Sequence, residues 1–159
     1  MDVVISYQLA GHGWADCTVS INDARVTISA SYISHALEDL AAAVVAAMRG
    51  HPLAKATFDE EPGEYRWTLE HLADGEVQVR ILEFAQLRGG RPDSEGKVLL
   101  SEKCRLRTFA GALLSELQRI DHEVGRKGYR EKWVLADFPA ARMEELEGLL
   151  AEGRRRTSR

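Results

Sequence analysis

The sequence has few of the residues that build metal sites or disulfide frameworks. Its 159 residues include only two cysteines, Cys17 and Cys104, which match neither a disulfide pattern nor a zinc-binding spacing. No glycine-rich loop opens a predicted helix, and no apolar run approaches the roughly 20 residues of a membrane span. A basic stretch followed by an apolar one, as in a secretion signal, is also missing. We therefore expect a cytoplasmic protein with no cofactor and no contact with a membrane.

Positive charge is scarce in the first half of the chain. Net charge is −4 overall, with −7 in residues 1–80 and +3 in residues 81–159. Four arginines in residues 153–159 supply much of the positive charge of the second half. We predict a single domain over residues 1–152 and a basic, disordered tail over 153–159. Because extended phosphate binding needs a basic surface, the acidic body argues against a nucleic-acid partner.

The ratio of arginine to lysine indicates the kind of genome that encodes the chain. The chain contains 16 arginines and 5 lysines, together with many alanines. This usage is typical of a GC-rich genome, and we expect a bacterial protein.

The first third of the chain predicts a three-stranded antiparallel meander. Apolar and polar residues alternate over 3–9, 15–21 and 24–30, which is the period of a half-buried strand. Turns are expected at Gly11–Gly13 and Asn22–Asp23. These turns place the following residues opposite one another: Ile5 and Val19, Tyr7 and Cys17, Val19 and Val26, Cys17 and Ile28.

Residues 55–70 predict a hairpin closed over Pro62 and Gly63. In this register Phe58 lies opposite Trp67 on the buried face, and Asp59 lies opposite Arg66 on the exposed face. A further turn at Ala73–Gly75 follows. A three-residue loop there pairs Leu69 with Val79 and Trp67 with Ile81, which keeps the apolar residues on one face.

Helical periodicity appears in three places. The first predicted helix has Ser34 as its N-cap and ends at Gly50, the second begins at Thr108, and the third begins at Pro139. A last strand is expected over 97–106, and residues 129–135 fit a helix, a strand or a loop. The element order βββ-α-ββββ-α-α predicts an α+β two-layer sandwich, with a mostly antiparallel sheet of about seven strands and the helices packed on one face.

The chemical motifs do not combine into a catalytic or metal site. The acidic group Asp59, Glu60, Glu61 and Glu64 surrounds one turn, without the spacing of a known cation loop. Both cysteines occupy inward strand positions, where a thiol behaves as a small hydrophobic group. The histidines share no spacing on one element. We therefore predict no catalytic, cofactor-binding or metal-binding residues, and we do not expect an enzyme.

What remains is the outward face of the sheet, which predicts a surface for a partner. Its candidate contact residues are Trp14, Arg66, Arg80, Leu82 and Phe84. Either a partner protein covers their apolar members or the chain from Tyr129 onward does. The leading hypothesis is a non-catalytic interaction protein of the immunity or chaperone type. We expect a homodimer or a stable complex, formed through the outer face or through the unprotected edge of the strand over residues 2–9.

A second hypothesis places a pocket between the sheet and the helices. Four polar residues fall on otherwise apolar inward positions, namely Tyr7, Glu60, His71 and Glu102. Because buried polar groups need partners, they would be the polar contacts of a small ligand. A cavity lined by these four residues favours a small-molecule binding domain or an enzyme, whereas a filled core favours the interaction protein.

Overall fold

The computed structural model describes residues 2–31, 35–60, 62–86, 90–133 and 137–157, with side chains as far as residue 152. Within these ranges the strands are β1 (Val3–Ala10), β2 (Trp14–Ile21), β3 (Ala24–Ser31), β4 (Leu53–Glu60), β5 (Gly63–His71), β6 (Glu76–Phe84) and β7 (Lys97–Arg105). The α-helices are α1 (Ala36–Met48), α2 (Leu106–Glu123), α3 (Gly125–Trp133) and α4 (Ala140–Thr157). The α+β sandwich and the order of its elements along the chain confirm the prediction, with α3 as an additional helix between the last two that we expected.

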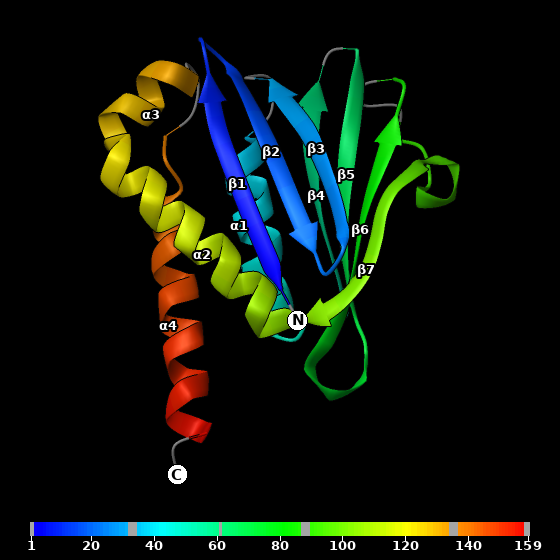
Figure 1. Cartoon of the computed structure of the whole chain (residues 1–159), viewed down its shortest axis with the longest axis vertical. Coiled ribbons are helices and arrows are strands. Elements are labelled where there is room, and N and C mark those ends of the chain that lie inside the picture. Colours follow the sequence, from blue (N-terminus) through cyan, green and yellow to red (C-terminus); the bar gives the residue numbers. More distant parts are fainter. Residues whose placement is uncertain (1, 32–34, 61, 87–89, 134–136, 158–159) are drawn as a thin grey trace.

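The strands form two antiparallel sheets, whereas we expected a single sheet. The N-terminal sheet has the order β1-β2-β3 and the C-terminal sheet has the order β4-β5-β6-β7 (Figure 1). Side chains join the two sheets at both ends of β3. The Ser31 hydroxyl donates to the carbonyl of Asp59 at 3.0 Å, and the Asn22 amide donates to the carbonyl of Lys103 at 3.3 Å. The sheets therefore meet through side chains and not through a continuous backbone ladder.

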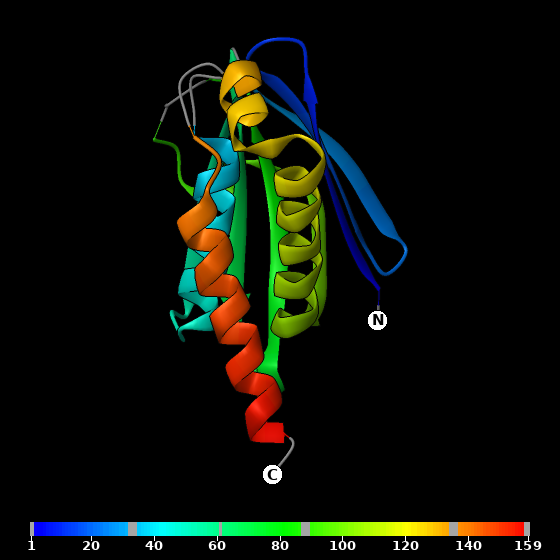
Figure 2. The same cartoon turned by 90° about the vertical axis from the view of Figure 1, so that its left-hand side faces the viewer.

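Three of the helices lie together on one side of the sheets (Figure 2). Helices α1 and α2 each pack mainly on the sheet that does not immediately precede them in the chain. Helix α1 follows the N-terminal sheet and contacts β4, whereas α2 follows the C-terminal sheet and contacts β1. Helix α4 contacts both α1 and α2. This exchange of helices ties the two halves of the chain into one core.

The registers of the N-terminal sheet confirm the prediction. Tyr7 lies opposite Cys17, and Cys17 lies opposite Ile28. The left-handed conformation falls where the turns require it, at Gly13 with φ 78° and at Asn22 with φ 55°. Strict alternation was sufficient here because a slip of one residue would turn every apolar side chain outward.

The predicted register between β4 and β5 is wrong by two residues. Phe58 lies opposite Tyr65, Trp67 lies opposite Ala56, and Asp59 lies opposite Glu64. A shift of two keeps every residue on its predicted face. Phe58 and Trp67 are both fully buried and remain neighbours, with ring centroids 5.5 Å apart.

Contacts from outside the hairpin accompany this register. Ser29 and Ser31 of β3 donate to the Glu60 carboxylate at 2.6 Å and to the Asp59 carbonyl at 3.0 Å. At the other end of β4, the amide of His71 donates to the carbonyl of Pro52 at 2.9 Å. Cross-strand pairing within the hairpin sequence could not reveal these long-range partners.

The next hairpin confirms the prediction. Leu69 lies opposite Val79 and Trp67 lies opposite Ile81. The turn contains Asp74 and Gly75, with φ values of 60° and 75°. The longer loop therefore directs the apolar side chains of β6 into the core, as the hydrophobic pattern required.

The helices begin and end close to their predicted bounds. Helix α2 begins at Leu106, two residues before the predicted start, and the ambiguous stretch beginning at 129 belongs to α3 as far as Trp133. Helix α4 continues to Thr157, past the predicted domain boundary at residue 152. The predicted N-cap Ser34 and residues 134–136 lie outside the described residues.

Candidate functional site

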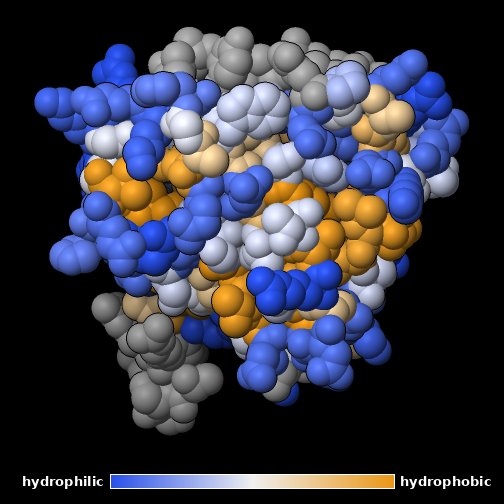
Figure 3. Space-filling view, turned by 45° about the horizontal axis from the view of Figure 1, so that its top comes forward, coloured by the Kyte–Doolittle hydropathy of each residue, from blue (hydrophilic) through white to orange (hydrophobic). Residues whose placement is uncertain are grey.

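The predicted partner-binding face is divided between the two sheets. Trp14 belongs to β2 and is 42% exposed, whereas the other four candidates belong to β5 and β6. Leu82 and Phe84 are buried, with 3% and 4% of their surface exposed. Figure 3 displays one face of the molecule, where a hydrophobic area at the left is separated by hydrophilic and near-neutral side chains from a broader one at the centre and right. The structure therefore shows no flat aromatic patch formed by these residues.

A segment that we call the strap, residues 90–97, covers part of this face. A side chain added at Gly96 would come within 2.8 Å of the Phe84 ring and 2.9 Å of the Cβ of Leu82, so glycine permits the close approach. We expected the chain beyond Tyr129 to provide any such cover. The connection between β6 and β7 provides it instead, and a partner is not needed to bury Leu82 and Phe84.

Arg66 holds the strap against the sheet. Its guanidinium lies 4.3 Å from the centroid of the Phe84 ring and donates to the Asp93 carboxylate at 2.7 Å. It also donates to the carbonyl of Arg91 at 2.8 Å and to Glu64 at 3.3 Å. Its predicted partner Asp59 lies elsewhere in the ladder. Arg66 is therefore a structural clamp within the chain, and not a free contact residue.

Arg80, the remaining candidate on this face, is more accessible. Its side chain is 39% exposed and lies 3.8 Å from the Glu70 carboxylate. Arg80 is therefore accessible on the surface, and an exposed pair of this kind contributes little to stability.

The β1 edge, which we expected to be open, is covered by α2. The backbone N–H of Tyr7 donates to Glu116 Oε2 at 2.5 Å, and Arg119 donates to the carbonyl of Tyr7 at 3.1 Å. Arg119 also binds both oxygens of Glu116, at 2.6 and 2.8 Å. The ion pair thus takes the place of a neighbouring strand at Tyr7, where self-association through this edge was predicted.

The four polar residues of the predicted internal pocket do not meet in one cavity. Tyr7 is buried in the core, and its ring packs against Phe58 at 6.3 Å. Glu60 accepts the bond from Ser29, and the His71 imidazole contacts the carbonyl of Ala47 at 2.7 Å. Glu102 lies on β7, opposite Val79. Tyr7, Glu60 and His71 are thus each engaged by neighbours of their own, and none of the four residues lines the groove along β4 described below.

The other chemical candidates remain dispersed. Among the described residues, no three His, Cys, Asp or Glu side chains lie close enough to hold a metal ion. Cys17 and Cys104 are free thiols, with 1% and 0% of their surface exposed. Burial raises the pKa of Cys17 to about 12, with a smaller contribution from the charge of Glu116. Burial also raises the pKa of Cys104 to about 11, with a contribution from Glu76.

Both thiols should react slowly with a thiol reagent at pH 8 in the folded protein and rapidly after denaturation, because only the thiolate is nucleophilic. Well below pH 9 the thiols are almost fully protonated in both states, so folding exchanges almost no proton, although at pH 8 the unfolded chain already contains a reactive fraction of thiolate. As pH rises from about 9 towards 12, the unfolded chain loses the Cys17 proton while the folded chain keeps it, so stability falls. Urea unfolding between pH 8 and 10.5 should show a shallower decline in Cys17→Ala, by up to about 1.4 kcal/mol per pH unit. Fast labelling of native protein would contradict the expectation.

A concave surface that the predicted sites do not include lies along β4. Strand β4 is a terminal strand of its sheet, so only one of its edges pairs with β5. The His71 amide donates to the carbonyl of Pro52, so the backbone N–H and C=O groups of even-numbered β4 residues point to β5. The Ser31 hydroxyl donates to the carbonyl of Asp59, so the backbone groups of odd-numbered β4 residues point to the free edge. Lys55 and Thr57 therefore direct two N–H and two C=O groups to the free edge. No hydrogen bond joins these four groups to another described residue.

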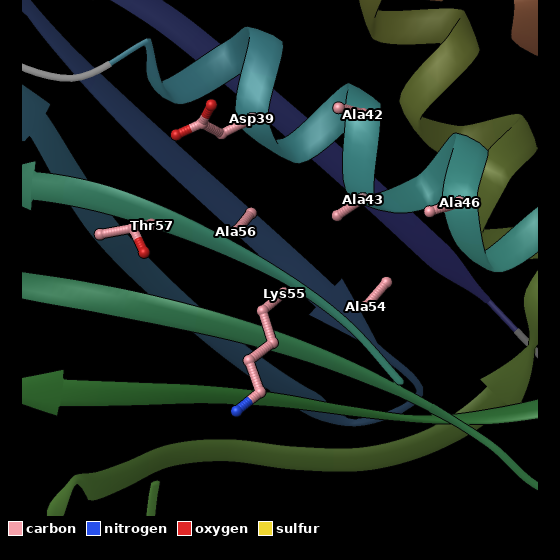
Figure 4. Close-up of a pocket in the computed structure, with 8 residues that line it drawn as sticks. All are labelled: Asp39, Ala42, Ala43, Ala46, Ala54, Lys55, Ala56 and Thr57. Carbon is pink, nitrogen blue, oxygen red and sulfur yellow. The ribbon is translucent and has the colours of Figure 1, made fainter. Parts of the chain in front are cut away.

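Helix α1 forms the facing wall of this groove. Asp39, Ala42, Ala43 and Ala46 recur at helical spacing on the side of α1 that faces β4 (Figure 4). The strand side is lined by 54–57, where the methyl groups of both alanines project towards α1 and Lys55 points away. Because alanine carries only one methyl group, the helix and the strand leave a groove of about 400 Å³ between them.

Of the described residues that line the groove, Asp39 alone is acidic, and it lies near Thr57 at one end (Figure 4). Burial raises the pKa of the Asp39 carboxyl, and the charges of Glu38 and Asp59 raise it further, whereas His35 lowers it. No ion pair or side-chain hydrogen bond joins Asp39 to another described residue. This end of the groove therefore favours positive charge.

Sequence reasoning missed this groove. The alanines of α1 fell within the first predicted helix without a role of their own, and the strand order that makes β4 an edge was not predictable. The available signal was the small size of the residues on both sides, Ala42, Ala43 and Ala46 against Ala54 and Ala56.

Comparisons with family models, with curated proteins and with solved structures gave no match to this chain. In the described part of the chain, none of the helices has the length and hydrophobicity needed to cross a membrane.

Proposed function

We propose that this protein is a non-catalytic interaction module that binds an extended segment of a partner protein along β4. The observation that carries the proposal is the groove between β4 and α1, into which Lys55 and Thr57 direct unpaired backbone groups. An extended peptide can add itself to such an edge as a further strand, with its backbone hydrogen bonds providing affinity. A role in masking a partner, as immunity proteins and chaperones perform it, belongs to this class.

The dimensions of the groove suit a short segment. Residues 53–57 precede the point where Ser31 occupies the carbonyl of Asp59. At about 3.3 Å per residue, this stretch spans roughly 16 Å and accommodates about five residues of an added strand. Side chains of that strand on the α1 side would pack on the alanine methyl groups, while the alternate ones would face solvent.

Thr57→Pro should abolish binding while leaving the fold intact. The N–H of Thr57 points to the free edge, so proline removes a donor from the groove but none from the ladder with β5. The probe is a displayed library of random ten-residue peptides selected on the wild-type protein. We expect the selected peptides to bind the variant at least tenfold more weakly, because proline removes one hydrogen bond and adds a steric block.

Ser101→Pro is the matched control, because it places the same change on the outer edge of β7. The carbonyl of Lys103 accepts a hydrogen bond from Asn22, so the backbone groups of odd-numbered β7 residues also point away from the neighbouring strand β6. This variant should bind the peptides as the wild type does. Failure to select any peptide, or equal binding to Thr57→Pro, would overturn the proposal. A homodimer seen by light scattering and dissolved by Thr57→Pro would assign the edge to a second copy instead.

A further inference from the structure

We infer that the segment bound along β4 carries a lysine or arginine whose charged group reaches Asp39. This inference rests on the proposed function and names the chemistry of its partner. The groove would then bind an extended backbone through Lys55 and Thr57, and one basic side chain through Asp39.

The cations near α1 are already engaged by other carboxylates. Arg142 binds Glu38 at 3.0 Å and Glu145 at 2.7 Å. Arg49 binds Glu145 at 2.8 Å. Arg142 belongs to α4 and Arg49 follows the last residue of α1, and both are paired in this way. Asp39 takes part in neither of these ion pairs.

The strand side of the groove includes one cationic residue, Lys55, but its side chain points away from Asp39. Its ammonium group binds the Asp93 carboxylate of the strap at 2.9 Å, on the face of the sheet opposite α1. Because successive strand residues point to opposite faces, Lys55 cannot turn towards Asp39 without leaving that face. The Asp39 carboxylate on α1 thus receives no cation from the facing strand β4.

The environment of Asp39 makes an incoming cation favourable. Glu38 and Asp59 add negative charge to a site that already excludes part of the surrounding water. Charges act more strongly where water is partly excluded, so a cation at this point gains more than on an open surface. Among the described residues, the charge of His35 opposes this effect, and burial outweighs its influence on the pKa of Asp39.

The shape of the groove suits a long basic side chain. A lysine or arginine on the α1 side of the added strand would lay its methylene groups over the methyl groups of Ala42 and Ala43. Its charged group would then lie at the end of the groove, beside Asp39 and Thr57. Long basic side chains commonly bury their stems in this way while the charge stays at a polar end.

Selection from the same random ten-residue library tests the inference. Peptides selected on the wild-type protein should be enriched in lysine or arginine at one position, and those selected on Asp39→Lys should carry aspartate or glutamate there. A synthetic wild-type peptide should bind Asp39→Lys about tenfold or more weakly at low salt, because close charge pairs across an interface contribute on this scale. The loss should shrink as salt increases.

Asp23→Lys is the matched control, because it makes the same change of net charge at an exposed turn of the other sheet. It should leave peptide binding unchanged. If selected peptides require the Thr57 amide but show no basic preference, or bind Asp39→Lys as they bind the wild type, the inference is wrong and the proposed function stands. If no peptide is selected, or if Thr57→Pro binds equally well, both are wrong.

Discussion

Replacing Trp67 by alanine is expected to lower the free energy of unfolding by about 3–5 kcal/mol. The side chain has no exposed surface and packs between Phe58, at 5.5 Å, and Phe109, at 6.4 Å between ring centroids. It therefore joins β4, β5 and α2 in one cluster. Removal of the indole leaves a cavity that three elements would have to close. Urea unfolding followed by circular dichroism measures the loss.

Trp67→Phe is the matched control. Its aromatic ring preserves much of the packing, and it removes the indole Nε1, which is buried without a hydrogen-bond partner in the described structure. We expect a loss of about 1–2 kcal/mol at most, because the lost volume is partly offset by removal of the unsatisfied N–H group. If Trp67→Ala costs less than about 1 kcal/mol, the position of Trp67 at the centre of the core is wrong.

Glu116→Ala is expected to destabilise the protein by about 2–4 kcal/mol. The Glu116 carboxylate is 7% exposed and binds both the backbone N–H of Tyr7 and the guanidinium of Arg119. Removal of Glu116 leaves the buried N–H of Tyr7 without its acceptor and takes one carboxylate from Arg119, which keeps Glu123 at 2.8 Å. The lower end of the range reflects Arg119, which is 30% exposed and can regain water.

Hydrogen exchange at the Tyr7 amide separates this role from simple loss of packing. The amide should be protected in the wild type and should exchange faster in Glu116→Ala, whereas Glu116→Gln, which keeps an acceptor oxygen, should retain part of the protection. The alanine variant should also associate more readily at micromolar concentration, because an uncovered strand edge pairs with other chains. Unchanged protection of Tyr7 would show that the Glu116 contact does not hold this edge.

Local patterning predicted most of the secondary structure and much of the pairing. Where each strand alternates strictly, as in β1 to β3, the register followed from the turns. The predicted register of β4 and β5 was wrong by two residues, because residues Ser29 and Ser31, which contact this hairpin, come from another sheet. Pairing rules applied to the hairpin alone do not include such contacts.

The candidate site was less predictable than the fold. Its identity depends on β4 being a terminal strand and on α1 crossing to the sheet that follows it, and neither is encoded in a local pattern. The outward residues Leu82 and Phe84 suggested a partner because the strap could not be placed from sequence. Glycine at position 96 is a local signal for such an approach, but it becomes informative only once the facing strands are known.

The exchange of helices between the sheets has a consequence for synthesis on the ribosome. Tyr7 finds its edge partner Glu116 only 109 residues later, and β4 begins after α1 has already been made. The outer backbone edge of β1 therefore stays uncovered during most of translation, until α2 has been synthesised. Long sequence separations of this kind slow folding and prolong the exposure of unpaired edges. A nascent chain stalled before residue 106 should consequently expose β1 to chaperones, and release beyond α2 should end that exposure.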